Sequence, residues 1–126
     1  MNSEEKGTVT AIADHGLIGD LRTAALVTRD GTIDWLCVPR FDSASVFCAL
    51  LDPARGGEWR LAPTCEVSTT HQFHFPGSNV LITRFLTEDG VAEVRDFMPL
   101  GPETTRRLAA CCGSSSPSVA RWSCAR

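Results

Sequence analysis

The stretch that decides the fold runs from Thr23 to Val38 and reads TAALVTRDGTIDWLCV. Two runs rich in β-branched and aliphatic residues flank Asp30-Gly31, and this arrangement is the strongest short-range signal for a β-hairpin. A type I′ turn is expected there because Asp and Gly tolerate the positive φ that both central residues require. Alternation along the second run would place Asp34 on the face opposite Trp35.

The same chemistry recurs further along the chain. Val80–Thr87 and Val91–Met98 flank Asp89-Gly90, which predicts a second hairpin of the same kind. Asp30, Gly31, Asp89 and Gly90 are therefore assigned structural roles in turns. Short strands are also expected at 58–62 and 66–75, and a helical turn capped by Asp42 or Ser43 is expected within 45–51. Several short strands with turn signals between them predict an all-β fold, an antiparallel β-sandwich.

Composition limits the classes of function. The 126 residues are 43% hydrophobic, which suits one modest domain with a packed core. A net charge of −3 argues against general nucleic-acid binding, and no run is long enough to span a membrane. The N-terminus lacks the apolar stretch of a secretory signal, so a cytoplasmic location is expected. The six cysteines have no metal-ligand spacing, so we expect free thiols and neither a metal nor a cofactor.

The charge changes sign near Pro99. Residues 1–100 hold 8 Lys or Arg and 14 Asp or Glu, whereas residues 101–126 hold four Arg and one Glu. We therefore expect a disordered N-terminus over 1–10, a β domain over 11–100 and a tail over 101–126. The tail has no strand or helix period, and two interpretations stay open. It is either a disordered Ser-rich segment or a segment read out of frame from GC-rich DNA.

Four stretches carry a resemblance to a known family. They are IADHGLIGDLRTAALVTRDGTIDWLCVPRFDS at 12–43, LAP at 61–63, FPGSNVLITRF at 75–85 and DGVAEVRDFMP at 89–99. Together they resemble the N-terminal β-rich domain of bacterial trehalase-like and glucoamylase-like proteins of glycoside hydrolase family 15.

The resemblance implies a parent protein that hydrolyses α-glucosidic bonds by an inverting mechanism. In that scheme one carboxylic acid protonates the leaving oxygen and one carboxylate activates water. In the family both groups are Glu residues of an (α/α)6 barrel that follows this domain, and no residue of this chain matches either. The chain is therefore expected to be a truncated fragment without turnover of its own. The missing barrel is its expected partner, with an α-glucoside and self-association as further candidates.

Two rival interpretations of the function stay open. One is a stand-alone carbohydrate-binding or interaction module, and the other is an inert product of a truncated gene. Trp35, Arg40, Phe41 and Asp42 form the candidate site, since they lie at the end of a strand and on the loop after it. These four residues would form a structural corner held by an Arg–Asp fork, a loop packed against the barrel near its active-site rim, or a direct sugar contact.

Overall fold

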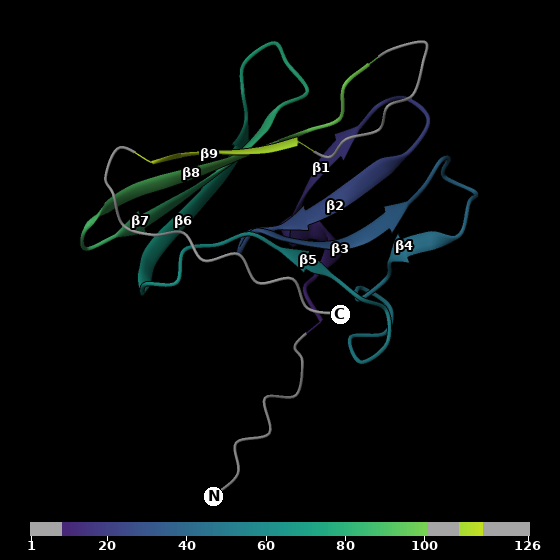
Figure 1. Cartoon of the computed structure of the whole chain (residues 1–126), viewed down its shortest axis with the longest axis horizontal. Helices are drawn as coiled ribbons and strands as arrows, with labels where there is room; N and C mark the ends of the chain where they lie inside the picture. Colours follow the sequence, from purple (N-terminus) through teal and green to yellow (C-terminus); the bar gives the residue numbers. More distant parts are fainter. Residues whose placement is uncertain (1–8, 101–108, 115–126) are drawn as a thin grey trace, which may run out of the picture.

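The computed structural model describes residues 9–100 and, for the backbone only, residues 109–114. Two antiparallel sheets make up the molecule, as Figure 1 shows. The elements in chain order are the 3-10 helix η1 (Ile12–Asp14) and the strands β1 (His15–Gly19), β2 (Ala24–Thr28), β3 (Thr32–Cys37), β4 (Ser45–Phe47), β5 (Trp59–Arg60), β6 (Val67–His74), β7 (Leu81–Thr87), β8 (Gly90–Phe97) and β9 (Ala109–Ser114). The predicted all-β antiparallel fold is confirmed.

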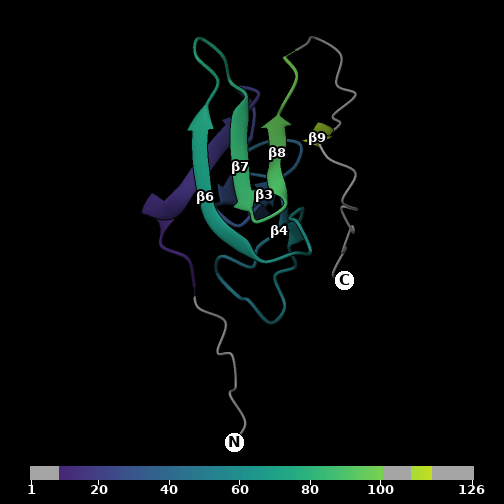
Figure 2. The same cartoon turned by 90° about the vertical axis from the view of Figure 1, so that its left-hand side faces the viewer.

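The first sheet has the order β1-β2-β3-β4, and β5 pairs with the same edge of β3 as β4 does. The second sheet has the order β6-β7-β8-β9. In Figure 2 the strands β6, β7 and β8 run side by side with β3 and β4 of the first sheet behind them. The sheets therefore pack face to face as a sandwich, in which each buries one side against the other.

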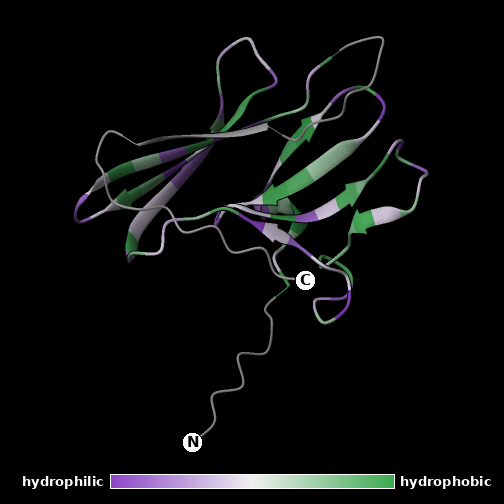
Figure 3. Cartoon of the chain, viewed as in Figure 1, coloured by the Kyte–Doolittle hydropathy of each residue, from purple (hydrophilic) through white to green (hydrophobic). Residues whose placement is uncertain are grey.

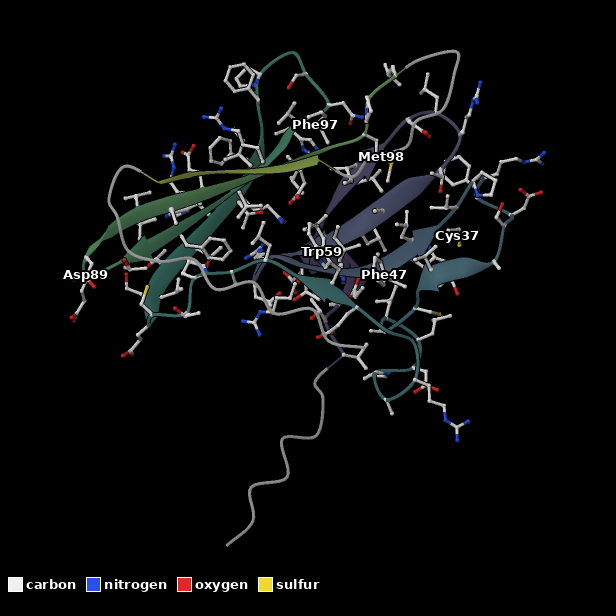
Figure 4. The ribbon with its side chains drawn as sticks, viewed as in Figure 1. Cys37, Phe47, Trp59, Asp89, Phe97 and Met98 are labelled. Atoms are coloured by element: carbon white, nitrogen blue, oxygen red, sulfur yellow. The ribbon has the colours of Figure 1, made fainter. Side chains whose placement is uncertain are left out.

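The core contains two clusters of buried side chains. The first gathers residues of β1, β2 and β3 with the first residue of β7: Ile18, Ala25, Val27, Ile33, Leu36 and Leu81. The second consists of Leu61, Phe85 and Val94. Phe47, Trp59 and Met98, labelled in Figure 4, pack as partly buried residues against the first cluster. Hydrophobic colour follows β1 and β2 in Figure 3, whereas the tip of the β7–β8 hairpin is hydrophilic.

Strand β1 was not predicted from the sequence, because its residues HGLIG include two glycines and no run of strand formers. The structure explains Gly16 by a close contact between the sheets. A Cβ built there would lie 2.5 Å from Cδ2 of Leu81, so a larger residue would push the two sheets apart. Pairing with β2 from His15↔Thr28 to Gly19↔Ala24 then supplies the backbone hydrogen bonds that a strand needs.

The outer edge of β1 is covered by side chains of the second sheet. His74 Nε2 donates to the carbonyl of Leu17 at 2.9 Å, and Asn79 Nδ2 donates to the carbonyl of Gly19. Unpaired carbonyls on an edge strand are otherwise available to another chain. These two bonds therefore both protect the edge and fix one sheet to the other.

Both hairpins are present, but the predicted type I′ turn is wrong in each. In the β2–β3 loop only Gly31 has a positive φ, +83°, and its N–H donates to Thr28 O at 3.0 Å. This is a three-residue loop that ends in a left-handed glycine, the next commonest hairpin geometry. In the second hairpin Thr87 pairs with Gly90, so the loop is Glu88-Asp89 and Asp89 lies at its outer tip (Figure 4).

Two further segments differ from the sequence-based expectation. Strand β4 takes up the first part of the segment expected to form a helical turn, because Ser45 and Phe47 pair with the end of β3, and a turn in which Cys48 O accepts from the N–H groups of Leu51 and Asp52 follows it. Strand β9 lies in the segment for which no strand was predicted and pairs along β8 from Ala92↔Ser114 to Phe97↔Ala109. Pairing uses main-chain groups, so a free edge such as that of β8 can hold a strand without a typical strand composition. The remaining residues of the predicted tail and of the predicted N-terminal extension up to Thr8 lie outside the described residues.

Candidate functional site

The loop after β3 gathers three of the four candidate residues. Arg40 forms a bidentate fork with Asp42, with Nε 3.0 Å from Oδ1 and Nη2 2.9 Å from Oδ2. Both side chains are about 70% exposed (68% and 71%), so solvent screens the pair and it adds at most about 1 kcal/mol to stability. Phe41 between them is 63% exposed. Trp35 is half-buried on β3, where it pairs with Leu26 of β2.

This loop is joined to the neighbouring β1–β2 loop. The N–H of Phe41 donates to the carbonyl of Arg22 at 3.0 Å. Asp20 holds the β1–β2 loop in shape, since its Oδ1 accepts the N–H groups of Arg22 and Thr23, each at 2.9 Å. The two loops therefore form one end of the first sheet, and we call Leu21 and Phe41 its apolar tip.

Leu21 has an unusual backbone for its residue type. Its φ is +71°, and among the described residues it is the one non-glycine with positive φ. Its side chain is 89% exposed, so no packing contact explains the strained conformation. A branched apolar residue in the left-handed region costs about 1 kcal/mol or more relative to glycine or asparagine. Backbone strain of this kind clusters at functional sites, so Leu21 is a candidate functional residue.

A buried hydrogen-bonded pair of a histidine and a carboxyl group lies at the other end of β1. His15 Nε2 is 2.8 Å from Asp34 Oδ2, and the side chains are 0% and 9% exposed. His15 Nδ1 is 2.9 Å from the carbonyl of Ala11, which can only accept, so Nδ1 carries a hydrogen. The bond between Nε2 and Oδ2 therefore contains one further proton, carried either by the imidazole or by the carboxyl group.

Sequence reasoning missed this pair. His15 and Asp34 are 19 residues apart and belong to β1 and β3, which β2 separates. The available signal was Asp34 itself, a carboxylate within the apolar run Thr32–Cys37. A buried charge needs a partner, so its position called for a donor from another strand.

Two small clefts flank the pair. The first has a volume of about 170 Å³ and includes Asp34, Glu58 and Arg60 in its wall. The second has a volume of about 200 Å³ and includes His15, Arg29 and His74. Within residues 9–100 no cluster of three or more His, Cys, Asp or Glu side chains has the arrangement of a metal site. The cysteines of that range, Cys37, Cys48 and Cys65, are free thiols.

One more carboxylate is perturbed. Asp96 on β8 is 5% exposed, and burial raises its pKa from 3.8 to about 6. On the same strand Glu93 behaves in the opposite way, because its hydrogen bond with Arg84 lowers its pKa below 4.5. Asp96 lies on the same face of β8 as the core residue Val94, and no described residue pairs with it as a second catalytic carboxylate.

Three of the four candidate residues, Arg40, Phe41 and Asp42, thus lie on the exposed loop, and the fourth, Trp35, is half-buried on β3. Asp30 and Gly31 lie in the β2–β3 loop, and Asp89 and Gly90 lie in and beside the β7–β8 loop. None of these groups forms the facing pair of carboxylates that glycoside hydrolysis uses. In the part of the chain that the structure covers, no helix has the length and apolar character of a membrane span.

Comparison with known proteins gives one consistent result. A family described as trehalase-like, N-terminal, matches residues 5–120. The trehalase of Mycolicibacterium smegmatis is 44% identical over 92 residues, which is 72% of this chain and 14% of that protein. Trehalase 1 of Sulfolobus acidocaldarius is 42% identical over 92 residues, 73% of this chain and 16% of its own length.

The trehalase of Thermoplasma volcanium is 39% identical over 87 residues, 68% of this chain and 14% of that protein. The chain therefore spans about a seventh of the length of these curated relatives, 14% to 16%. No solved structure matches it.

Proposed function

The chain belongs to the trehalase-like, N-terminal family, and from that membership we propose that it serves as the accessory β domain of a glycoside hydrolase. The proposed parent is a family 15 enzyme of trehalase or glucoamylase type that cleaves α-glucosidic bonds with inversion. The observation that carries the proposal is that this β domain matches about a seventh of the length of proteins named trehalase. In the M. smegmatis trehalase the matched share is 14%. The catalytic Glu pair would lie in the part of such proteins that this chain does not match.

The apolar tip is the proposed contact with that catalytic part. Leu21 and Phe41 are 89% and 63% exposed, and the Arg40–Asp42 fork flanks Phe41 with charge. An apolar centre with a polar rim is the usual composition of an interdomain contact. The loop would pack on the barrel near its active-site rim, while Trp35 supports β3 from a half-buried position. The three free cysteines of the described range support a reducing compartment, and we propose the cytoplasm.

A domain exchange tests the proposal. Residues 1–100 of this chain replace the matched segment of the M. smegmatis trehalase, and glucose release from trehalose is measured. We expect the exchanged protein to retain activity, whereas the relative with its matched segment deleted should be inactive or insoluble. The 126-residue chain alone should release no glucose from trehalose, maltose or soluble starch.

Two results would contradict the proposal. Turnover by the isolated chain would place catalysis within this domain. Unchanged activity of the relative after deletion of the matched segment would remove the accessory role. The alternative of a stand-alone carbohydrate-binding module requires the isolated chain to bind a glucan, so an affinity-gel assay with soluble starch separates it from the accessory role.

A further inference from the structure

The outer face of the first sheet carries a buried polar floor. Thr28, Thr32 and Asp34 are 5%, 5% and 6% exposed, and alternation places them opposite the core residues Val27 and Ile33. The segment before η1 and the loop between β4 and β5 cover this floor. They leave the cleft of about 170 Å³ between them. A polar floor beneath a cleft is retained only when its groups find partners.

Two acceptors of the cleft lack a donor. Asp34 Oδ2 is hydrogen-bonded to His15, but Oδ1 is buried without a hydrogen-bond partner among the described residues. Glu58 forms no hydrogen bond or ion pair within the described part of the chain. Arg60 is the cation of the cleft wall, and it lies 3.8 Å from Asp30 at the far limit of an ion pair. His15 and Asp34 share one proton and together are neutral, so Glu58 is the carboxylate of the cleft without a counterion among the described residues, and Asp34 Oδ1 is the buried acceptor without a donor.

We propose that this cleft binds an alkyl cation, a primary ammonium or guanidinium group carried on a short apolar stem. Charge-assisted N–H donors satisfy carboxylate oxygens more strongly than neutral hydroxyls do. One cation that reaches both groups would offset the charge of Glu58 and supply the donor that Asp34 Oδ1 lacks. Arg60, the cation of the cleft wall, is paired with Asp30, and this pairing reduces its repulsion of a bound cation.

The remaining wall suits the stem of such a group. Val9, Leu50 and Pro53 line the cleft beside the carboxylates. Methylene stems pack on surfaces of this kind while their charged end reaches polar groups. The volume of about 170 Å³ is comparable to cavities of roughly 150 Å³ that hold a molecule of six heavy atoms. A neutral polyol would satisfy single oxygens but would leave the carboxylate of Glu58 without a counterion.

The test is a titration of the full 126-residue chain with n-butylammonium chloride, followed by amide NMR at Thr32 and Leu50. The neutral probe n-butanol and the polyol glucose are titrated in parallel. Glu58→Gln removes one proposed ligand without removing a structural bond. Glu88→Gln, in the exposed β7–β8 loop, is the matched control. We expect saturable shifts with n-butylammonium in the wild type and in Glu88→Gln, roughly five-fold weaker binding in Glu58→Gln, and no saturation with n-butanol or glucose.

A second arm identifies the source of the cation. N-acetyl-lysine N-methylamide presents a lysine side chain, and binding tighter than that of n-butylammonium indicates a polypeptide partner. Equal or weaker binding of the blocked lysine indicates a free amine. The proposal is overturned if n-butylammonium gives no saturable shift, if n-butanol binds equally well, or if Glu58→Gln binds like the wild type. Saturation by glucose in place of n-butylammonium would overturn it too.

Discussion

His15 Nε2 and Asp34 Oδ2 lie 2.8 Å apart and join β1 to β3 across the intervening strand β2. With His15 Nδ1 bonded to Ala11 O, the imidazole also fixes the segment that leads into η1. The pair is therefore a cross-link between three parts of the chain that the backbone pairing of β1 and β3 does not connect. Its contribution depends on both members, because either one alone would be a buried polar group without its partner.

The first prediction concerns this pair. His15→Ala leaves Asp34 buried without any side-chain donor, so we expect a loss of about 3 kcal/mol or more in the free energy of unfolding. His71→Ala on the exposed face of β6 is the control and should change the free energy by about 0.5 kcal/mol or less. Urea denaturation measures both variants. Equal effects of the two substitutions would show that the His15–Asp34 bond does not stabilise the fold.

The second prediction separates the two turn glycines. A Cβ at Gly31 would lie 2.3 Å from the carbonyl oxygen of Leu61, at a backbone φ of +83°, so steric and conformational strain add. A Cβ at Gly90 would meet nothing within 4 Å, and only its φ of +153° resists substitution. We expect Gly31→Ala to lose about 3 kcal/mol and Gly90→Ala about 1 kcal/mol.

Chemical denaturation of the two variants checks this order. The same loss in both would mean that the contact with Leu61 relaxes without strain. A larger loss at Gly90 would show that the β7–β8 loop, and not the β2–β3 loop, is the more constrained connection.

The hairpins and the sandwich could be predicted from local chemistry, whereas the features set by packing could not. Asp30-Gly31 between two apolar runs is a local signal, and it correctly placed β2 and β3. Strand β1 depends on the fit of Gly16 against Leu81, 65 positions further along the chain. No propensity of the residues around Gly16 reports that contact.

The alternation of β3 also failed as a guide to its buried face. Ile33 and Leu36, which strict alternation places on opposite faces, belong to the same buried cluster. The register of β3 against β4 shifts between Leu36 and Cys37, and that of β2 against β3 shifts between Leu26 and Val27. Bulges of this kind depend on the partner strand, so the sequence of one strand does not reveal them.

The candidate site shows the same division. The Arg40–Asp42 fork was an expected local pairing, and the structure contains it. The grouping of Trp35 with Phe41 rested on nearness in sequence, and the sequence did not report that Trp35 is half-buried on β3 while Phe41 is exposed on the loop. The strained backbone of Leu21 has no sequence signature, because leucine is not a residue that turns require.

The third prediction concerns pH. Burial holds the pKa of Asp96 at about 6 in the folded state against 3.8 as its reference, so the folded state binds the proton more tightly than the unfolded state. The contribution of Asp96 to the free energy of unfolding should therefore be greatest below about pH 4. It should fall as pH rises from about 4 to about 6 and stay lower above that range. The full difference corresponds to roughly 3 kcal/mol as an upper bound.

Asp96→Asn removes this dependence, so the variant should be more stable than the wild type at neutral pH and lose that advantage near pH 4. Glu93 contributes to stability in the opposite sense, because its pKa is lowered on folding and the stability it adds is lost as pH falls below 4.5. Both proteins contain Glu93, so comparing them at each pH cancels this contribution. A constant difference between the proteins from about pH 4 to 7.5 would show that Asp96 is not held neutral by burial.

The fourth prediction concerns the apolar tip in the isolated chain. The tip residues Leu21 and Phe41 are 89% and 63% exposed, whereas Phe47 packs against the first core cluster. Phe41→Ser should therefore reduce self-association and the binding of a hydrophobic dye without changing the denaturation midpoint, and Phe47→Ser should destabilise the domain by about 2–4 kcal/mol. Sedimentation and dye fluorescence provide the measurement. A wild-type chain that stays monomeric and binds no dye would argue against the tip as a contact surface.

The last prediction uses the strain at Leu21 to separate folding from docking. Asparagine tolerates a φ of +71° better than leucine does, so Leu21→Asn should raise the free energy of unfolding of the isolated chain by about 0.5–1 kcal/mol. The same change removes an apolar side chain that is 89% exposed. In the exchanged trehalase it should therefore weaken the contact with the catalytic part and lower activity or thermal stability.

Leu21→Val, which keeps an apolar side chain but tolerates positive φ poorly, is the matched control and should destabilise the isolated chain. A gain in stability from Leu21→Asn with no loss in the exchanged enzyme would mean that the strained leucine has no role in docking.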